Sequence, residues 1–173
     1  MIFKSYEIQK NYSRLTENNF FLCYGENFGL KQDIKEIIKK SIITKDKNLE
    51  ILSFYEDDII ENEKNFYNNI YSGSLFGNKK LISINNGTDK IMKKIEDIVN
   101  KFPKNTYIII FSDILEKKSK LRNFFEKNSK TICIPCYFDA EKDLEIIAIN
   151  KLKQNGINIS KESMNLLVSQ SNN

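Results

Sequence analysis

Five short segments rich in β-branched and aromatic residues, separated by segments with helical spacing, constrain the fold of this 173-residue chain more than any other feature. The strand-like segments cover residues 20–24, 49–54, 80–84, 106–111 and 131–135. Strands that alternate with helices form a parallel sheet with helices on its faces. We therefore predict an α/β fold built on a parallel five-stranded sheet with helices on both faces.

The segments between the strands carry apolar residues three or four positions apart, as amphipathic helices do. We expect helices within residues 5–16, 28–43, 57–71 and 91–102, and a further one around Leu121, Phe124 and Phe125. The segment 106–111 is the most apolar of the chain, which is typical of a central strand buried on both faces.

From Asp139 onward the pattern becomes helical only, with Gly156 ending one helix and Ser160 beginning another. Two helices alone bury little apolar surface. We therefore expect an α/β domain over residues 1–138, followed over residues 139–173 by the first helices of an incomplete helical domain.

The chain has no run of about 20 apolar residues that could span a membrane, and its N-terminus lacks the features of a signal peptide. The cysteine count of three is odd, which suggests reduced thiols. These observations predict a cytoplasmic protein without membrane contact.

The formal net charge of +4 suggests a nucleic-acid partner at first sight. However, of 27 basic residues only Arg14 and Arg122 are arginines, and recognition of phosphates and bases favours arginine for its bidentate fork. The excess of Lys, Asn and Ile is a compositional bias of the whole chain. We do not expect a dedicated nucleic-acid surface on this part.

Cys133 and Cys136 form a C-x-x-C pair, which can be half of a zinc site or a redox pair. Zinc requires four ligands, and the chain has neither a second pair nor a histidine. The pair also lies in and just after a strand, whereas a redox pair begins a helix. We predict buried structural cysteines and no metal site.

The turn after the first strand is where an α/β fold of this kind would bind nucleotide phosphates. A phosphate-binding loop requires G-x-x-x-x-G-K-[ST]. Here Gly25 and Gly29 are one residue too close, Lys31 is one place late, and Gln32 replaces the hydroxyl residue. Glu26 adds negative charge in the path of a triphosphate. The sequence predicts a degenerate loop that does not bind nucleotide.

No catalytic constellation accompanies this loop. An ATPase would need an acidic pair directly at the end of the apolar strand to hold Mg²⁺ and orient water. Here the single Asp113 lies beyond the strand end and has no neighbouring Glu, so a turn or capping role is favoured. Asp57 and Asp58 are typical of a solvated helix start. One alternative remains a divergent P-loop ATPase that uses Lys31 and Asp113. Another is a different α/β protein-interaction domain.

A bulky apolar pair, Leu75–Phe76, lies between Gly73 and Gly77 in a predicted surface turn. A polar helix precedes this turn and a basic strand start follows it. The two side chains can fold back as part of the core, or they can form an exposed anchor pair that fills a pocket of a partner. The residues alone leave both readings open.

Several segments in order resemble the N-terminal half of the delta subunit of the bacterial DNA polymerase III clamp loader. They cover residues 21–26, 73–84, 115–121, 133–138 and 156–160. The resemblance implies an AAA+ module, related to the P-loop NTPases, that has lost ATP binding and needs no cofactor. It also identifies residues 139–173 as the start of a helical lid domain.

The resemblance further implies a role in DNA replication. Ser74, Leu75, Phe76 and Gly77 would form the clamp-binding element, in which Leu75 and Phe76 fill a pocket of the ring-shaped sliding clamp, the beta subunit. Binding would open the ring for loading onto primed DNA while other subunits hydrolyse ATP. The chain would then be a non-catalytic subunit of the polymerase complex.

Members of this family are about twice as long as this chain and end in a helical collar. The collar joins them to the other loader subunits, delta prime and gamma/tau. We therefore expect those partners only if the collar is present, and contact with primed DNA only through the complex.

Overall fold

The computed structural model describes residues 2, 18–43, 49–72, 79–101, 103–137, 145, 148–149, 152–153 and 155–171. The chain divides into two compact units, Met1–Tyr137 and Phe138–Asn173, and each is described by itself. The helix predicted over residues 5–16 lies outside the described residues.

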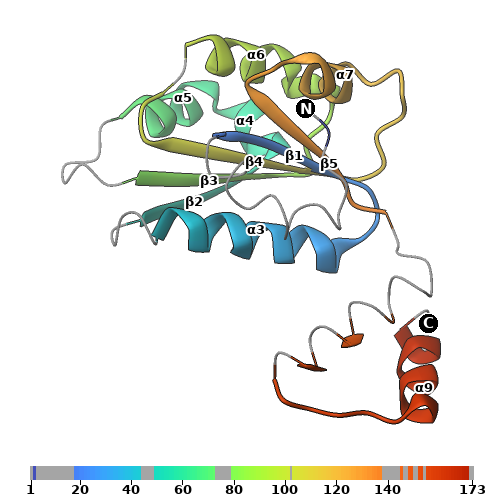
Figure 1. The fold of residues 1–173 in the computed structure, drawn as a ribbon. Coiled ribbons are helices and arrows are strands. Elements are labelled where there is room, and N and C mark those ends of the chain that lie inside the picture. The colour runs from blue at the N-terminus through green and yellow to red at the C-terminus, as the bar shows by residue number, and fades with distance from the viewer. Residues whose placement is uncertain are drawn as a thin grey trace. The chain divides into compact units, whose positions relative to one another are not determined.

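The first unit contains the predicted five-stranded parallel sheet (Figure 1). Its strands are β1 (Phe20–Tyr24), β2 (Leu49–Tyr55), β3 (Lys79–Asn85), β4 (Thr106–Ser112) and β5 (Thr131–Pro135). The strand order is β2-β3-β4-β1-β5, and every neighbouring pair is parallel. β4 is the middle strand, which confirms the prediction drawn from its apolar composition.

Helices cover both faces of this sheet, as predicted. They are α3 (Phe28–Ile43), α4 (Glu56–Glu61), α5 (Glu63–Tyr71), the short 3-10 helix η1 (Asp89–Ile91), α6 (Met92–Asn100) and α7 (Lys120–Lys127). α3 lies on one face and α5, α6 and α7 lie on the other (Figure 1). Side chains alternate between the two faces along a strand. Accordingly, Phe21 and Cys23 pack with α3, whereas Phe20 and Leu22 pack with the opposite helices.

The single helix predicted over residues 57–71 is wrong, because the chain forms two helices that meet at Asn62. The backbone of Asn62 is not helical (φ −131°, ψ 65°), and its side chain accepts a hydrogen bond from the Asn65 amide, so that it begins α5 as an N-cap. Next to this break Ile59 is buried, whereas Ile60 is exposed.

The second unit contains α9 (Lys161–Ser171), which begins where the sequence predicted. The Ser160 hydroxyl accepts from the Ser163 amide, as an N-cap does. Gly156 has a positive φ of 68°, and its amide donates to the carbonyl of Lys153, which agrees with its predicted role as a helix stop. Most of the helix predicted from Asp139 lies outside the described residues.

Within the described ranges, no helix combines the length and the apolar composition that crossing a membrane requires.

Candidate functional site

The carboxyl ends of the parallel strands meet at one edge of the sheet. β1 and β4 are neighbours there, and the helices that follow them, α3 and α7, lie on opposite faces. Such a switch point is where open α/β sheets bind their ligands. The degenerate loop lies at this point. It consists of the turn with Gly25 and Glu26 and the first turn of α3 with Gly29 and Lys31.

Gly25 is required by the chain's own backbone. Its φ is +126°, and a Cβ atom at this position would lie 2.1 Å from the carbonyl oxygen of Cys136. Its amide lies 3.3 Å from the carbonyl oxygen of Ser112 and 3.2 Å from that of Asp113, and donates to both. The loop is therefore packed against the ends of β4 and β5, with no room for a side chain at residue 25.

Two further amides of this loop donate to protein acceptors. The Asn27 amide donates to the Cys136 carbonyl over 2.9 Å, and the Leu30 amide donates to the Asn27 side chain over 2.9 Å. A phosphate-binding loop directs such amides at the ligand. In this chain the amides of Gly25, Asn27 and Leu30 are already used within the fold.

Lys31 and Asp113, the two residues of the ATPase alternative, do come together. The Lys31 ammonium lies 3.8 Å from an Asp113 carboxylate oxygen. The side chain of Lys31 is only 7% exposed, whereas that of Asp113 is 94% exposed. The cation that would reach a phosphate is thus held inside the protein and faces one of the chain's own carboxylates.

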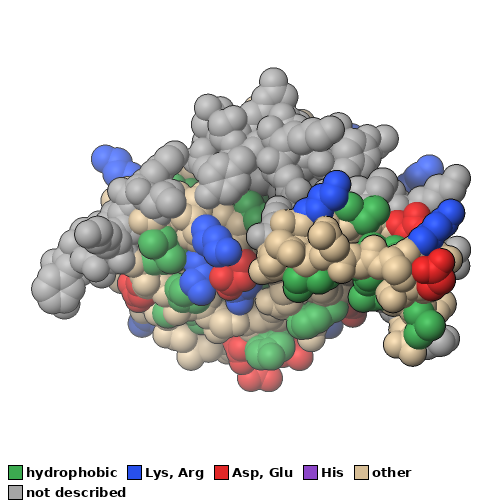
Figure 2. All heavy atoms as spheres, turned by 60° about the horizontal axis from the view of Figure 1, so that its bottom comes forward, with side chains coloured by type: hydrophobic (Ala, Val, Ile, Leu, Met, Phe, Trp, Pro, Cys, Tyr) green, Lys and Arg blue, Asp and Glu red, His purple; other side chains and the backbone are tan. Residues whose placement is uncertain are grey.

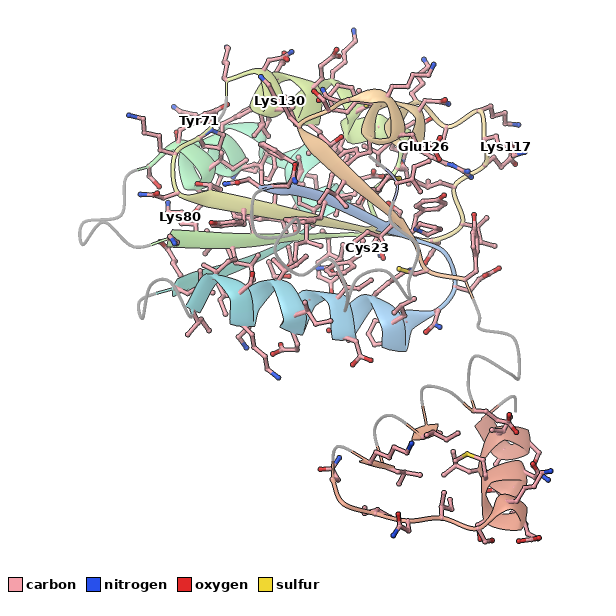
Figure 3. All side chains as sticks on the ribbon, viewed as in Figure 1. Cys23, Tyr71, Lys80, Lys117, Glu126 and Lys130 are labelled. Carbon is pink, nitrogen blue, oxygen red and sulfur yellow. The ribbon has the colours of Figure 1, made fainter. Side chains whose placement is uncertain are left out.

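All three cysteines are buried and free, as predicted. A hydrogen bond with Cys136, together with burial, raises the pKa of the Cys23 thiol well above its ordinary value. Burial raises the pKa of Cys133 to about 12. Only the thiolate is a good nucleophile or metal ligand, so a raised pKa makes Cys23 and Cys133 poor in both roles. Figure 3 shows Cys23 near the carboxyl edge of the sheet. Among the described residues, no three acidic, Cys or His side chains gather into a metal-binding group.

The sequence interpretation missed an aromatic and charged cluster at the same edge. The guanidinium of Arg122 lies 4.8 Å from the centre of the Tyr24 ring, and it also donates to Glu126 over 2.8 Å and to the Leu115 carbonyl over 2.9 Å. Burial, and then a hydrogen bond with Tyr137, raise the pKa of Tyr24. Arg122 is one of only two arginines in a lysine-rich chain, and this rarity could have drawn attention to it from the sequence.

Asp89 is a second residue that the sequence did not single out. Its carboxylate accepts hydrogen bonds from the Ser119 hydroxyl (2.7 Å), the Lys120 amide (3.0 Å) and the Leu121 amide (2.9 Å), and so caps the start of α7. Burial opposes ionisation of this carboxyl, but the hydrogen bonds from Leu121, Lys120 and Ser119 outweigh it and lower the pKa of Asp89. This acid serves the fold rather than a ligand.

The predicted clamp-binding residues Ser74, Leu75, Phe76 and Gly77 lie outside the described residues. The elements on either side of them are described: α5 ends at Tyr71 and β3 begins at Lys79. These two points lie at the amino edge of the sheet, opposite to the degenerate loop, because all strands run in the same direction. On α5 the rings of Tyr67 and Tyr71 stack 6.2 Å apart.

Basic side chains do not gather into one patch on the face shown in Figure 2. There the Lys and Arg side chains of the described residues lie among acidic and hydrophobic ones.

Comparison with known proteins gives consistent results. A family model described as "DNA polymerase III, delta subunit" matches residues 21–136. A probable DNA polymerase III subunit delta from Rickettsia prowazekii (strain Madrid E) is 30% identical over 157 residues, and the match covers 84% of this chain and 43% of that protein.

Two solved structures have a similar fold. The Bacillus subtilis DNA clamp loader delta protein superposes with a TM-score of 0.64 and 18% identity, over 95% of this chain and 51% of that one. Domain III of the replication initiation protein DnaA from Thermotoga maritima gives a TM-score of 0.54 and 14% identity, over 95% of this chain and 73% of that one. These similarities confirm the predicted AAA+-like α/β fold. The chain spans about half the length of the delta proteins that it matches.

Proposed function

The chain belongs to the family of DNA polymerase III delta subunits, and on this basis we propose that it binds and opens the ring-shaped sliding clamp during DNA replication. The observation that carries this proposal is the family match across residues 21–136, which include the Leu75–Phe76 motif. The motor subunits of the loader would hydrolyse ATP, and this chain would act on the clamp.

In this proposal Leu75 and Phe76 are the plug that enters a hydrophobic pocket of the clamp, and Ser74 and Gly77 shape the turn. Each of the two apolar side chains contributes roughly 1.5 to 3 kcal/mol when it is fully buried. Binding energy of that size is available to distort the clamp interface, provided that the open ring binds more tightly than the closed one.

The geometry of the degenerate loop supports a non-catalytic role. The amides of Gly25, Asn27 and Leu30 donate to protein acceptors, and Lys31 is paired with Asp113. A nucleotide would have to break several of these contacts before its phosphates could be bound. We infer that the chain acts mechanically, as a subunit of the polymerase complex that does not hydrolyse ATP.

The wider assembly is also part of the proposal. Residues 1–138 would form the clamp-binding AAA+-like domain, and residues 139–173 would form the first helices of the lid domain. The delta prime and gamma/tau subunits would be partners through the collar found in longer family members. Primed DNA would be contacted through the complex.

A ring-opening assay tests this function. Two fluorophores placed across one interface of the clamp report its separation when the chain is added. We expect the wild-type chain to increase the separation and the double variant Leu75→Ala/Phe76→Ala to have no effect. The matched control is Phe28→Ala/Ile114→Ala, which removes one exposed aromatic and one exposed aliphatic side chain at the opposite edge of the sheet. This control should open the clamp as the wild type does.

Two results would contradict the proposal. If the chain binds the clamp without separating the fluorophores, it is not an opener. If the Leu75→Ala/Phe76→Ala variant opens the ring as well as the wild type, the interface lies elsewhere on the chain.

A second candidate function is a divergent P-loop ATPase that uses Lys31 and Asp113, which the fold brings to within 3.8 Å of each other although they are paired in this structure. A titration with Mg-ATP separates it from the main proposal, because only an ATPase would be stabilised by the nucleotide.

A further inference from the structure

Lys80 is a buried cation at the amino edge of the sheet. Lys80 is only 4% exposed, although a lysine is rarely buried unless its charge is paired. Its ammonium donates to the Asn69 carbonyl (2.8 Å), to the Ser72 carbonyl (2.7 Å) and to the Ser72 hydroxyl (2.9 Å). An ammonium has three donors, so all of them are satisfied, and Glu50 lies 4.0 Å away.

The acceptors of Lys80 belong to the end of α5. The last carbonyls of a helix have no partner within the helix and carry the negative end of its dipole. The Lys80 ammonium supplies both a hydrogen-bond donor and a positive charge at this point. Figure 3 shows Lys80 at the beginning of β3, close to the end of α5 that carries Tyr71.

The backbone of Lys80 is fixed on both sides by the sheet. It is paired with Glu50 of β2 and with Thr106 of β4, and its amide donates to the Asn105 carbonyl over 2.8 Å. The side chain therefore reaches from a rigid strand to the final residue before the segment 73–78. Ser72, which directly precedes those six residues, is thus tied to β3, which directly follows them, through the Lys80 ammonium.

We propose that Lys80 is a positioning residue for clamp binding: by tying Ser72 to the start of β3, it holds both ends of the Leu75–Phe76 segment in the spacing from which the plug enters the clamp. This inference depends on the proposed function. Apolar residues of similar volume are often as stabilising as a buried ion pair, so stability alone does not explain a lysine here, whereas its contacts with Ser72 suit a positional role.

The physical consequence is preorganisation. If the ends of the segment are released, only a fraction of molecules present the plug in a binding-competent arrangement, and the apparent dissociation constant rises in inverse proportion to that fraction. Lys80 would thus contribute to affinity without contacting the clamp. The chemistry of the plug itself would be unchanged.

The test compares clamp affinity among four variants of the full chain. Lys80→Met keeps the length of the side chain but removes its charge and donors, and it should weaken binding about tenfold or more if the competent fraction falls to about a tenth. Lys80→Arg keeps the charge and donors and should restore most of the affinity. Lys79→Met removes the same charge from a half-buried side chain on the opposite face of β3, and it should bind within about twofold of the wild type. Leu75→Ala/Phe76→Ala is the fourth variant and reports on the plug itself.

The outcomes separate the inference from the function on which it depends. If Leu75→Ala/Phe76→Ala loses clamp binding while a folded Lys80→Met variant binds like the wild type, the positioning role of Lys80 is wrong. The assignment of Leu75 and Phe76 as the clamp-binding residues is then supported. If Lys79→Met and Lys80→Met weaken clamp binding equally, the loss of affinity comes from the lost net charge alone. That result would also overturn the positioning role of Lys80. If Leu75→Ala/Phe76→Ala binds like the wild type, the plug and the positioning role are both wrong.

A peptide keeps the inference testable if Lys80→Met does not fold. A synthetic peptide of residues 70–82 carries the plug and Lys80 without the sheet that fixes them. We expect it to bind the clamp at least about tenfold more weakly than the whole chain. Affinity equal to that of the whole chain would overturn the positioning role.

Discussion

Replacing Gly25 with alanine tests whether the degenerate loop is held by the protein's own backbone. The new Cβ would lie 2.1 Å from the Cys136 carbonyl oxygen, which is backbone and cannot rotate away, and the φ of +126° is strained for an L-residue. Such a backbone strain costs about 1 to 3 kcal/mol, and an overpacked contact costs a similar amount. We therefore expect Gly25→Ala to lower the free energy of unfolding by about 3 kcal/mol or more.

Urea denaturation followed by circular dichroism measures this loss. With a slope of about 2 kcal/mol per M, the midpoint should fall by about 1.5 M. The matched control is Gly29→Ala in the first turn of α3, where a Cβ would meet only the Asn27 side chain at an ordinary 3.6 Å. That change should be neutral or should stabilise by up to about 1 kcal/mol. Equal midpoints for the two variants would refute the reasoning.

Two further predictions concern the same edge of the sheet. We expect about 5 mM Mg-ATP to change the melting temperature by no more than about 1 °C, because the loop amides and Lys31 are already paired within the fold. A nucleotide present at 100 times its dissociation constant would stabilise the fold by about 2.7 kcal/mol, so a clear increase in melting temperature would favour the ATPase alternative. We also expect Asp89→Asn to destabilise by roughly 1 kcal/mol at neutral pH through the weakened cap of α7. Because the folded pKa of Asp89 is lowered from 3.8, the stabilisation is present above about pH 4 and is lost as the pH falls through the folded pKa. The difference between wild type and Asp89→Asn in urea midpoint should therefore shrink in acid, and a constant difference would contradict this account.

Much of the fold could be predicted because its signals are local. Continuous apolar runs such as 20–24 and 106–111 became buried strands with nearly the predicted bounds. The end of the strand at Asn85 was marked by the Asn-Asn-Gly turn, in which Asn86 takes a left-handed backbone with φ 57°. By contrast, the break at Asn62 depends on a single side-chain cap inside an otherwise helical pattern.

The candidate sites were predictable in position but not in their internal contacts. The altered spacing of Gly25, Gly29 and Lys31 predicted a degenerate loop. The burial of Lys31 against Asp113 could not be predicted, because it depends on the pairing of β1 with β4, which brings the segments after these two strands together. Lys80 carried a signal that was not used, since Lys80, Ile82 and Ile84 share one face of β3 and the two isoleucines are core residues. A lysine in such an alternation indicates a buried charge that requires partners.

The affinity of the chain for the sliding clamp of its own organism tests the central claim most directly. The wild type and Leu75→Ala/Phe76→Ala would be titrated against the clamp by a label-free binding assay, with the fold of both checked by circular dichroism. The account predicts that the double variant binds about a hundredfold more weakly or worse, because two plug side chains together contribute at least about 3 kcal/mol. Unchanged affinity in the double variant, or no binding by the folded wild type, would contradict it.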